Sequence, residues 1–171
     1  MANSALLVLD VQNDIFVPEN PNLSAFETAL LVINEAIGLF RNEALPIALI
    51  QHASSKKPEG SESWMVYRGL NSTDSDFRLS KPFLDAFWQT ELDSHLRSSA
   101  VKDLIVCGFL SEHCVLSTYR GAIQRGFKAQ VLEGGVASLS DDMTEFTLRL
   151  CEHVSINRLA QLFAKGESGA R

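Results

Sequence analysis

The sequence is poor in positive charge. Its 171 residues include 15 lysines and arginines against 21 acids, which gives a formal net charge of -6, and it contains no basic run. Nucleic-acid binding depends on clustered Lys and Arg side chains that contact phosphates. We therefore expect no nucleic-acid partner.

Cysteine is scarce as well. Cys107, Cys114 and Cys151 are odd in number and have no paired spacing. The first residues lack the basic segment that opens a signal peptide. No apolar run reaches the roughly 20 residues needed to cross a bilayer. Together these features predict reduced thiols in a cytoplasmic protein that has no membrane contact.

Internal repeats and linker-like segments are also missing. The length fits one domain better than two, and 46% hydrophobic residues provide material for a core. We therefore predict a single domain over residues 1–171.

Apolar runs alternate with segments of helical periodicity along the chain. Such alternation is typical of βαβ units, which form a parallel sheet with helices on both faces. Ser24 and Glu27 have the spacing of a capping box at the start of the first helix. The predicted strands are 5–12, 46–53, 76–80, 102–109, 127–135 and 154–157, and the predicted helices are 22–45, 90–100, 112–126, 140–153 and 158–164.

Residues 53–80 interrupt this alternation with a long polar stretch that is rich in Ser, Gly and Pro. Connections of this length inside a compact domain are usually functional or mobile.

Three reactive side chains follow strands of the predicted sheet. Asp10 closes the first strand, Lys81 follows the short third strand, and Cys114 follows the fourth. Ligands of open α/β sheets bind outside the carboxyl ends of the strands. We therefore expect these three side chains to lie together at that edge.

The chemistry of these residues suits covalent catalysis. A helix start and the Lys81 ammonium would both stabilise a Cys114 thiolate. Asp10 would take the thiol proton and later hand it to a leaving group. Backbone N–H groups at the helix start would bind an oxyanion. Taken singly, each residue has a structural explanation: a buried apolar cysteine, a turn cap and a solvated lysine.

Four stretches carry a resemblance to a known family: "ALLVLDVQNDIF", "KPFLDAFWQTELDSHL", "DLIVCGFLSEHCVLSTYRGAIQRGF" and "VLEGGVAS". With them the chain resembles the isochorismatase-like cysteine hydrolases from Ala5 to about Leu159. Asp10, Lys81 and Cys114 match the catalytic triad of that superfamily position by position.

The resemblance implies a three-layer α/β/α fold with a six-stranded, mainly parallel sheet. It also implies a homo-oligomer, a dimer or tetramer, and hydrolysis of a small molecule through a thioester-type intermediate. A cis peptide bond between Phe109 and Leu110 would aim the N–H groups of Leu110 and Cys114 at the oxyanion.

Departures from the family pattern narrow the expected activity. Ser111 stands where threonine is usual, which keeps a hydroxyl group. Nicotinamidases of this superfamily carry an Asp-x-His metal pair and a further His, whereas this chain has only His52 after its second strand. We therefore expect no metal and no cofactor. Relatives that cleave a vinyl ether commonly lack the cysteine, so Cys114 favours C–N hydrolysis of an amide, ureido or carbamoyl compound.

Substrate contacts are expected from aromatic residues. Phe16 lies just past Asp10, and Trp64 and Tyr67 lie in the long connection, so we predict Phe16 and Trp64 as pocket walls. Two other hypotheses remain open. In the first, the protein is a catalytically silent oligomeric scaffold or a partner-binding protein of the same fold. In the second, Cys114 acts as a redox sensor.

Overall fold

The apolar runs of the sequence pair into one sheet in the computed structural model, which describes residues 3–167. Its strands are β1 (Ser4–Leu9), β2 (Ile47–His52), β3 (Phe77–Lys81), β4 (Asp103–Phe109), β5 (Lys128–Ala137) and β6 (His153–Ser155). Their order is β3-β2-β1-β4-β5-β6, and every pair is parallel. The predicted six-stranded, parallel α/β fold is confirmed.

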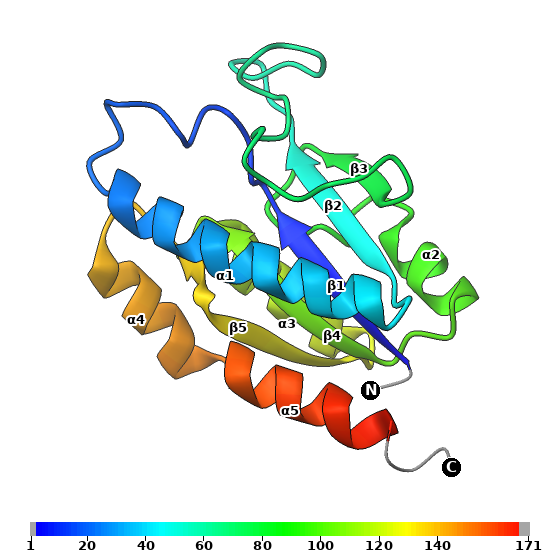
Figure 1. Cartoon of the computed structure of the whole chain (residues 1–171). Coiled ribbons are helices and arrows are strands. Elements are labelled where there is room, and N and C mark those ends of the chain that lie inside the picture. Colours follow the sequence, from blue (N-terminus) through cyan, green and yellow to red (C-terminus); the bar gives the residue numbers. More distant parts are fainter. Residues whose placement is uncertain (1–2, 168–171) are drawn as a thin grey trace.

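Helices cover both faces of this sheet (Figure 1). One face packs against α1 (Leu23–Asn42) and α5 (Ile156–Glu167). The other packs against α2 (Leu92–Ser98) and α3 (Leu116–Gln124), with α4 (Asp141–Leu150) beside β5. β1 is buried along its whole length because both of its faces are covered.

The first helix differs from expectation at its start and in its composition. It begins after Asn22, and the predicted cap by Ser24 is wrong, because no side-chain cap bond forms there. The Asn22 amide instead donates to the Ser138 carbonyl oxygen and to Asp141.

By length and composition alone, α1 is apolar enough to cross a membrane, contrary to expectation. Its inner face is buried against the sheet from Phe26 to Phe40, as in the core helix of a globular fold.

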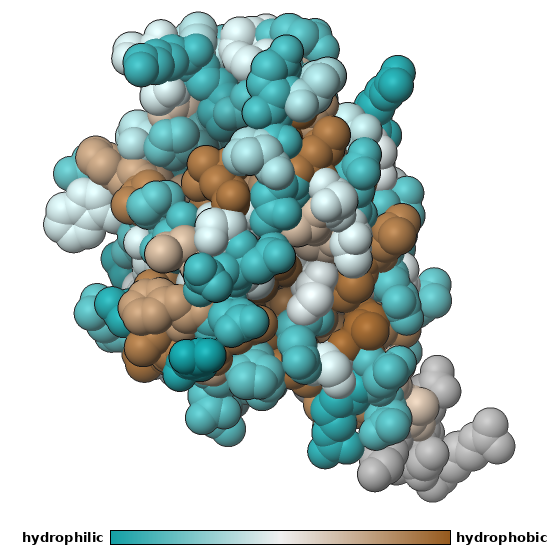
Figure 2. Space-filling model, turned by 90° about the vertical axis from the view of Figure 1, so that its left-hand side faces the viewer, coloured by the Kyte–Doolittle hydropathy of each residue, from teal (hydrophilic) through white to brown (hydrophobic). Residues whose placement is uncertain are grey.

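Helix α4 keeps an apolar stripe at the surface. Met143, Phe146 and Leu150 are between 43% and 51% exposed, and their spacing places them along one side of the helix. Leu139, which is 51% exposed, lies just before the helix begins. Figure 2, which views the side of the molecule where α4 lies, shows apolar patches among polar side chains. The same helix packs against the turn that carries Cys114.

The carboxyl ends of β1 and β4 meet with unusual backbone conformations. Asp10 has a φ of 56° and Gly108 a φ of 110°. A Cβ added to Gly108 would lie 2.0 Å from the carbonyl oxygen of Leu9. Only glycine fits at this contact, and it lets the two central strands approach closely just before the residues of the candidate site.

We expect Gly108→Ala to lower the free energy of unfolding by at least about 2 kcal/mol, because the added methyl group overlaps backbone atoms of β1. Gly38→Ala is the matched control. Gly38 lies inside α1 with no heavy atom within 4 Å of an added Cβ, so alanine should stabilise by about 0.5–1 kcal/mol. Urea unfolding followed by circular dichroism measures both. Equal effects of the two substitutions would contradict this account of Gly108.

Candidate active site

The three side chains at the strand ends come together around one ammonium group. Lys81 Nζ lies 2.9 Å from Asp10 Oδ2 and 3.1 Å from Cys114 Sγ. It also donates to the carbonyl oxygen of Phe83 at 3.2 Å. Lys81 is completely buried and Asp10 is 5% exposed. All three ammonium protons therefore have acceptors, which a buried lysine requires.

The topology explains this convergence. The strand order reverses between β1 and β4, and ligands of such sheets bind at that switch point. Asp10 follows β1, and the turn with Cys114 follows β4. Lys81 ends β3, beyond β2, so its long side chain extends past the end of β2 to reach Asp10.

Cys114 lies in a short turn of its own. The predicted helix over 112–126 is divided into a π-helical turn, η1 (Ser111–Val115), and α3. The N–H of Val115 donates to the carbonyl oxygen of Leu110 at 3.2 Å, and the peptide bond between Phe109 and Leu110 is cis. π-Helical turns often occur at functional sites.

The electrostatics of the free site keep the cysteine protonated. Burial, followed by the charge of Asp10, raises the pKa of the Cys114 thiol to about 12, although Lys81 acts in the opposite direction. Burial alone would lower the pKa of Lys81, but Asp10 and Cys114 offset it and the pKa is raised. The expected stabilisation of a thiolate by the ammonium is present, but burial and Asp10 outweigh it.

A cavity of about 210 Å³ opens onto Cys114. Polar side chains from three segments face it, including His52 at the end of β2 and His113 beside Cys114. The chain also contributes apolar walls from both sides of the switch point. The lining residues are Asp10, Asp14, Ile15, His52, Lys57, Leu84, Phe109, Leu110, His113 and Cys114.

The long connection supplies a second ion pair to this cavity. Lys57 Nζ lies 2.8 Å from Asp14 Oδ2 and 3.2 Å from the side-chain oxygen of Gln12. Buried Gln12 also donates to the carbonyl oxygens of His52 and Trp64. These bonds fasten the connection over the carboxyl edge of the sheet, so it is part of the site.

The structure places Phe16 and Trp64, the predicted pocket walls, outside this cavity. The Phe16 ring stacks on Tyr67 with centroids 3.8 Å apart. Trp64 lines a different hollow beside Arg78 on β3. Sequence reasoning missed Asp14 and Lys57. Asp14 follows Asp10 by four residues in the quoted motif, so the motif could have indicated it as a site residue. No sequence signal near Lys57 indicates a place in the site.

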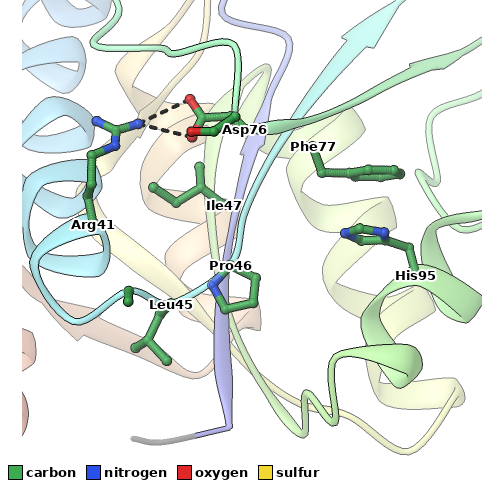
Figure 3. A pocket seen from close by; sticks show the side chains of 9 residues that line it. Arg41, Leu45, Pro46, Ile47, Asp76, Phe77 and His95 are labelled. Carbon is green, nitrogen blue, oxygen red and sulfur yellow. Dashed lines mark hydrogen bonds and ion pairs between the residues drawn. The ribbon is translucent and has the colours of Figure 1, made fainter.

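A larger hollow, of about 480 Å³, lies at the opposite edge of the sheet (Figure 3). Arg41 pairs with both carboxylate oxygens of Asp76 there, and the Phe77 and His95 rings stack 3.6 Å apart. Its lining includes no cysteine. Because it lies where β2 and β3 begin, it is remote from the thiol.

Three possible metal ligands lie close together, and the Cys114 thiol is one of them. Asp10, His52 and Cys114 offer ligand atoms within 4.8 Å of one another. However, the Lys81 ammonium contacts two of these groups, so a divalent cation would lie beside a buried positive charge. The cluster therefore fits an ion-pair network better than a metal centre.

The fold and the thiol at its switch point are typical of a small-molecule hydrolase built on an open parallel sheet. Residues 4–164 match the isochorismatase domain. The chain therefore belongs to the isochorismatase family, whose members are hydrolases, and the predictions of this family and of a hydrolase are confirmed.

Individual relatives agree with this assignment. An uncharacterised isochorismatase family protein of Bacillus subtilis, YddQ, is 28% identical over 93% of this chain and 91% of its own length. An isochorismatase-like hydrolase from Alkaliphilus metalliredigens superposes with a TM-score of 0.86 at 24% identity, covering 94% and 99% of the two chains. N-carbamoylsarcosine amidase from Thermoplasma acidophilum gives a TM-score of 0.76 at 22% identity, covering 90% and 95%.

The opposing influences of Asp10 and Lys81 on Cys114 can be separated by titration. Asp10→Asn should lower the pKa of the Cys114 thiol, because the carboxylate raises it. Lys81→Met should raise the pKa further, because the ammonium lowers it. Thiolate absorbance in the ultraviolet, followed towards alkaline pH, measures both. Cys151, whose burial raises its pKa to about 11, is the internal control. Shifts of Cys114 in the same direction in both variants would refute the assignment.

Proposed function

We propose that the chain is a metal-independent cysteine hydrolase that cleaves a C–N bond of a small amide, ureido or carbamoyl compound. The observation that carries this proposal is the Lys81 ammonium, which hydrogen-bonds Asp10 and Cys114 at once. A scaffold would gain little from a buried charged pair beside a thiol, since such pairs are weak sources of stability. The fold shared with N-carbamoylsarcosine amidase is consistent with this chemistry.

In the first half of the reaction, Asp10 takes the thiol proton as Cys114 Sγ attacks the substrate carbonyl carbon. The carbonyl oxygen becomes an oxyanion, for which the N–H groups of Leu110 and Cys114 are the donors. The N–H of Leu110 has no acceptor among residues 3–167, which leaves it free for this role. Asp10 then gives the proton to the leaving nitrogen, the C–N bond breaks, and a thioester-type acyl-enzyme remains.

In the second half, water attacks the acyl carbon while Asp10 takes a proton from it. The C–S bond breaks, the acid product leaves, and the proton on Asp10 returns to Cys114. Lys81 stays charged throughout and stabilises whichever of Asp10 or Cys114 carries the negative charge. Asp10 is thus base and acid in turn, which suits its position beside one ammonium and one thiol.

Cys114→Ala should lower kcat/KM for ammonia release from small amides and ureido compounds by at least about 1,000-fold, because the covalent step is lost. Asp10→Asn should act similarly, and mass spectrometry should detect an acyl adduct on Cys114 of the wild-type protein. Cys151→Ala is the matched control and should keep full activity. If the Cys114→Ala protein hydrolysed the same compounds as fast as wild type, Cys114 would not be the nucleophile. If neither protein hydrolysed any of them, the alternative of a scaffold or binding protein of this fold would be favoured.

We also propose that the chain is a cytoplasmic homo-oligomer, a dimer or tetramer. The three cysteines are free thiols, as expected in a reducing compartment. The apolar stripe of α4 is the kind of exposed surface that another subunit covers.

Phe146→Glu should therefore shift the protein towards smaller species in sedimentation velocity, because it introduces a charge into an apolar interface. Glu145→Gln, on the exposed polar side of the same helix, should leave the distribution unchanged. A wild-type protein that sediments as a monomer at micromolar concentration would rule out the oligomer.

A further inference from the structure

The hollow beside β3 that Trp64 lines has two positive charges in its lining and no negative one. It is formed by β2, β3 and the long connection, and its volume is about 530 Å³. Ligand pockets commonly measure about 300–1,000 Å³. The two charges are those of Arg68 in the connection and Arg78 on β3. Both side chains are exposed, so a ligand in the hollow can reach them.

Neither arginine has an acidic partner among residues 3–167. The only side-chain hydrogen bond of the two in that range joins Arg78 to the carbonyl oxygen of Thr73, at 3.4 Å. Asp76 is the acid nearest to Arg78 in the sequence, but Arg41 holds both of its carboxylate oxygens. Almost all N–H donors of the two guanidinium groups are therefore without a protein acceptor.

This local excess of positive charge runs against the composition of the chain. Acids outnumber lysines and arginines by 21 to 15, and arginines elsewhere pair with them, namely Arg41, Arg97, Arg125 and Arg149. The hollow also has apolar walls, which are made by Trp64, Val66 and Leu70. A cleft with charge of one sign and walls of low dielectric concentrates the electric field and attracts ligands of the opposite sign. The hollow is therefore suited to an anion.

The wall that bears Arg68 is fastened on both sides of that residue. Before it, the N–H of Tyr67 donates to the carbonyl oxygen of Val11 at 2.9 Å. After it, the side chain of Asn34 on α1 donates to the carbonyl oxygen of Gly69 at 2.8 Å. Arg78 stands on a strand of the sheet, so both arginines project from backbone that is already held in place. Binding then costs less conformational entropy than it would on a free loop.

From these observations we infer that the hollow is a second binding site, which takes a small phosphate monoester with an apolar remainder. A phosphate group carries a charge of about -1.5 to -2 at neutral pH, which balances two guanidinium groups, and its oxygens accept paired hydrogen bonds from arginine. A carboxylate has one charge and would leave one arginine unbalanced. The apolar remainder lies against Trp64, Val66 and Leu70. The site shares no lining residue with the cavity that opens onto Cys114.

Isothermal titration calorimetry with phenyl phosphate at neutral pH tests this site. Wild type should bind, and Arg68→Gln and Arg78→Gln should each weaken binding by about 10-fold or more, because each removes charge-assisted hydrogen bonds. Arg78→Lys should recover only part of the loss, since an ammonium keeps the charge without the planar fork. Arg158→Gln is the matched control. It removes an exposed arginine of α5 that lies outside the hollow, and it should bind within about twofold of wild type.

Three further probes each carry one part of the proposed ligand. Inorganic phosphate lacks the apolar remainder, phenol lacks the charge, and benzoate replaces phosphate by a carboxylate. Each should bind wild type at least about 10-fold more weakly than phenyl phosphate does, because each loses contacts with either the arginines or the apolar walls. Added sodium chloride should weaken the binding of phenyl phosphate, since both arginines are exposed and their charges are screened by salt.

Several results would overturn the inference. If wild type did not bind phenyl phosphate, the hollow would be an ordinary solvated surface. Equal affinity of wild type, Arg68→Gln and Arg78→Gln would place the ligand elsewhere, the cavity at Cys114 included. Benzoate that bound as tightly as phenyl phosphate would refute the phosphate class, and inorganic phosphate that did so would refute the role of the apolar walls. None of these measurements depends on hydrolysis, so the inference and the proposed reaction stand or fall separately.

Discussion

A single buried ammonium group organises the candidate site. Lys81 has no exposed surface, and its protons are taken by Asp10, the Phe83 carbonyl oxygen and Cys114. Removing one partner of a buried ion pair typically costs about 3–5 kcal/mol, because the other charge is left unpaired. The ends of β1, β3 and β4 are therefore held in one arrangement. Any movement that separated them would leave a charge buried in apolar surroundings.

The backbone meets this constraint with conformations that ordinary strands avoid. Asp10 adopts the left-handed region, which short polar side chains tolerate better than others. Gly108 allows β4 to approach Leu9 more closely than any side chain would permit. Cys114 stands in a π-helical turn that separates β4 from α3. These departures cluster at the switch point of the sheet, where strain and function are commonly found together.

Much of the fold and the three central residues could be predicted from the sequence, because each lies next to a strong local signal. Asp10, Lys81 and Cys114 each border a strand, and parallel strands bring their carboxyl ends to one edge. The path of the long connection had no such signal. Lys57 reaches the cavity on a connection that buried Gln12 fastens through bonds to His52 and Trp64, and those contacts span 40 and 52 sequence positions. The aromatic loop residues did not indicate the pocket walls, since the Phe16 ring stacks on Tyr67.

The protonated state of Cys114 is consistent with the proposed reaction. A helix start and an ammonium group suggest a thiolate when the sequence is considered alone, but burial and Asp10 prevail and raise the pKa to about 12. A thiol is far less reactive than a thiolate towards oxidants and stray electrophiles. In the proposed reaction the leaving nitrogen needs a proton, and the thiol already holds that proton within reach of Asp10. In that proposed reaction the cysteine is activated only when a carbonyl group occupies the cavity, so that the low resting reactivity of the thiol and the proposed C–N cleavage depend on the same arrangement of Asp10, Lys81 and Cys114.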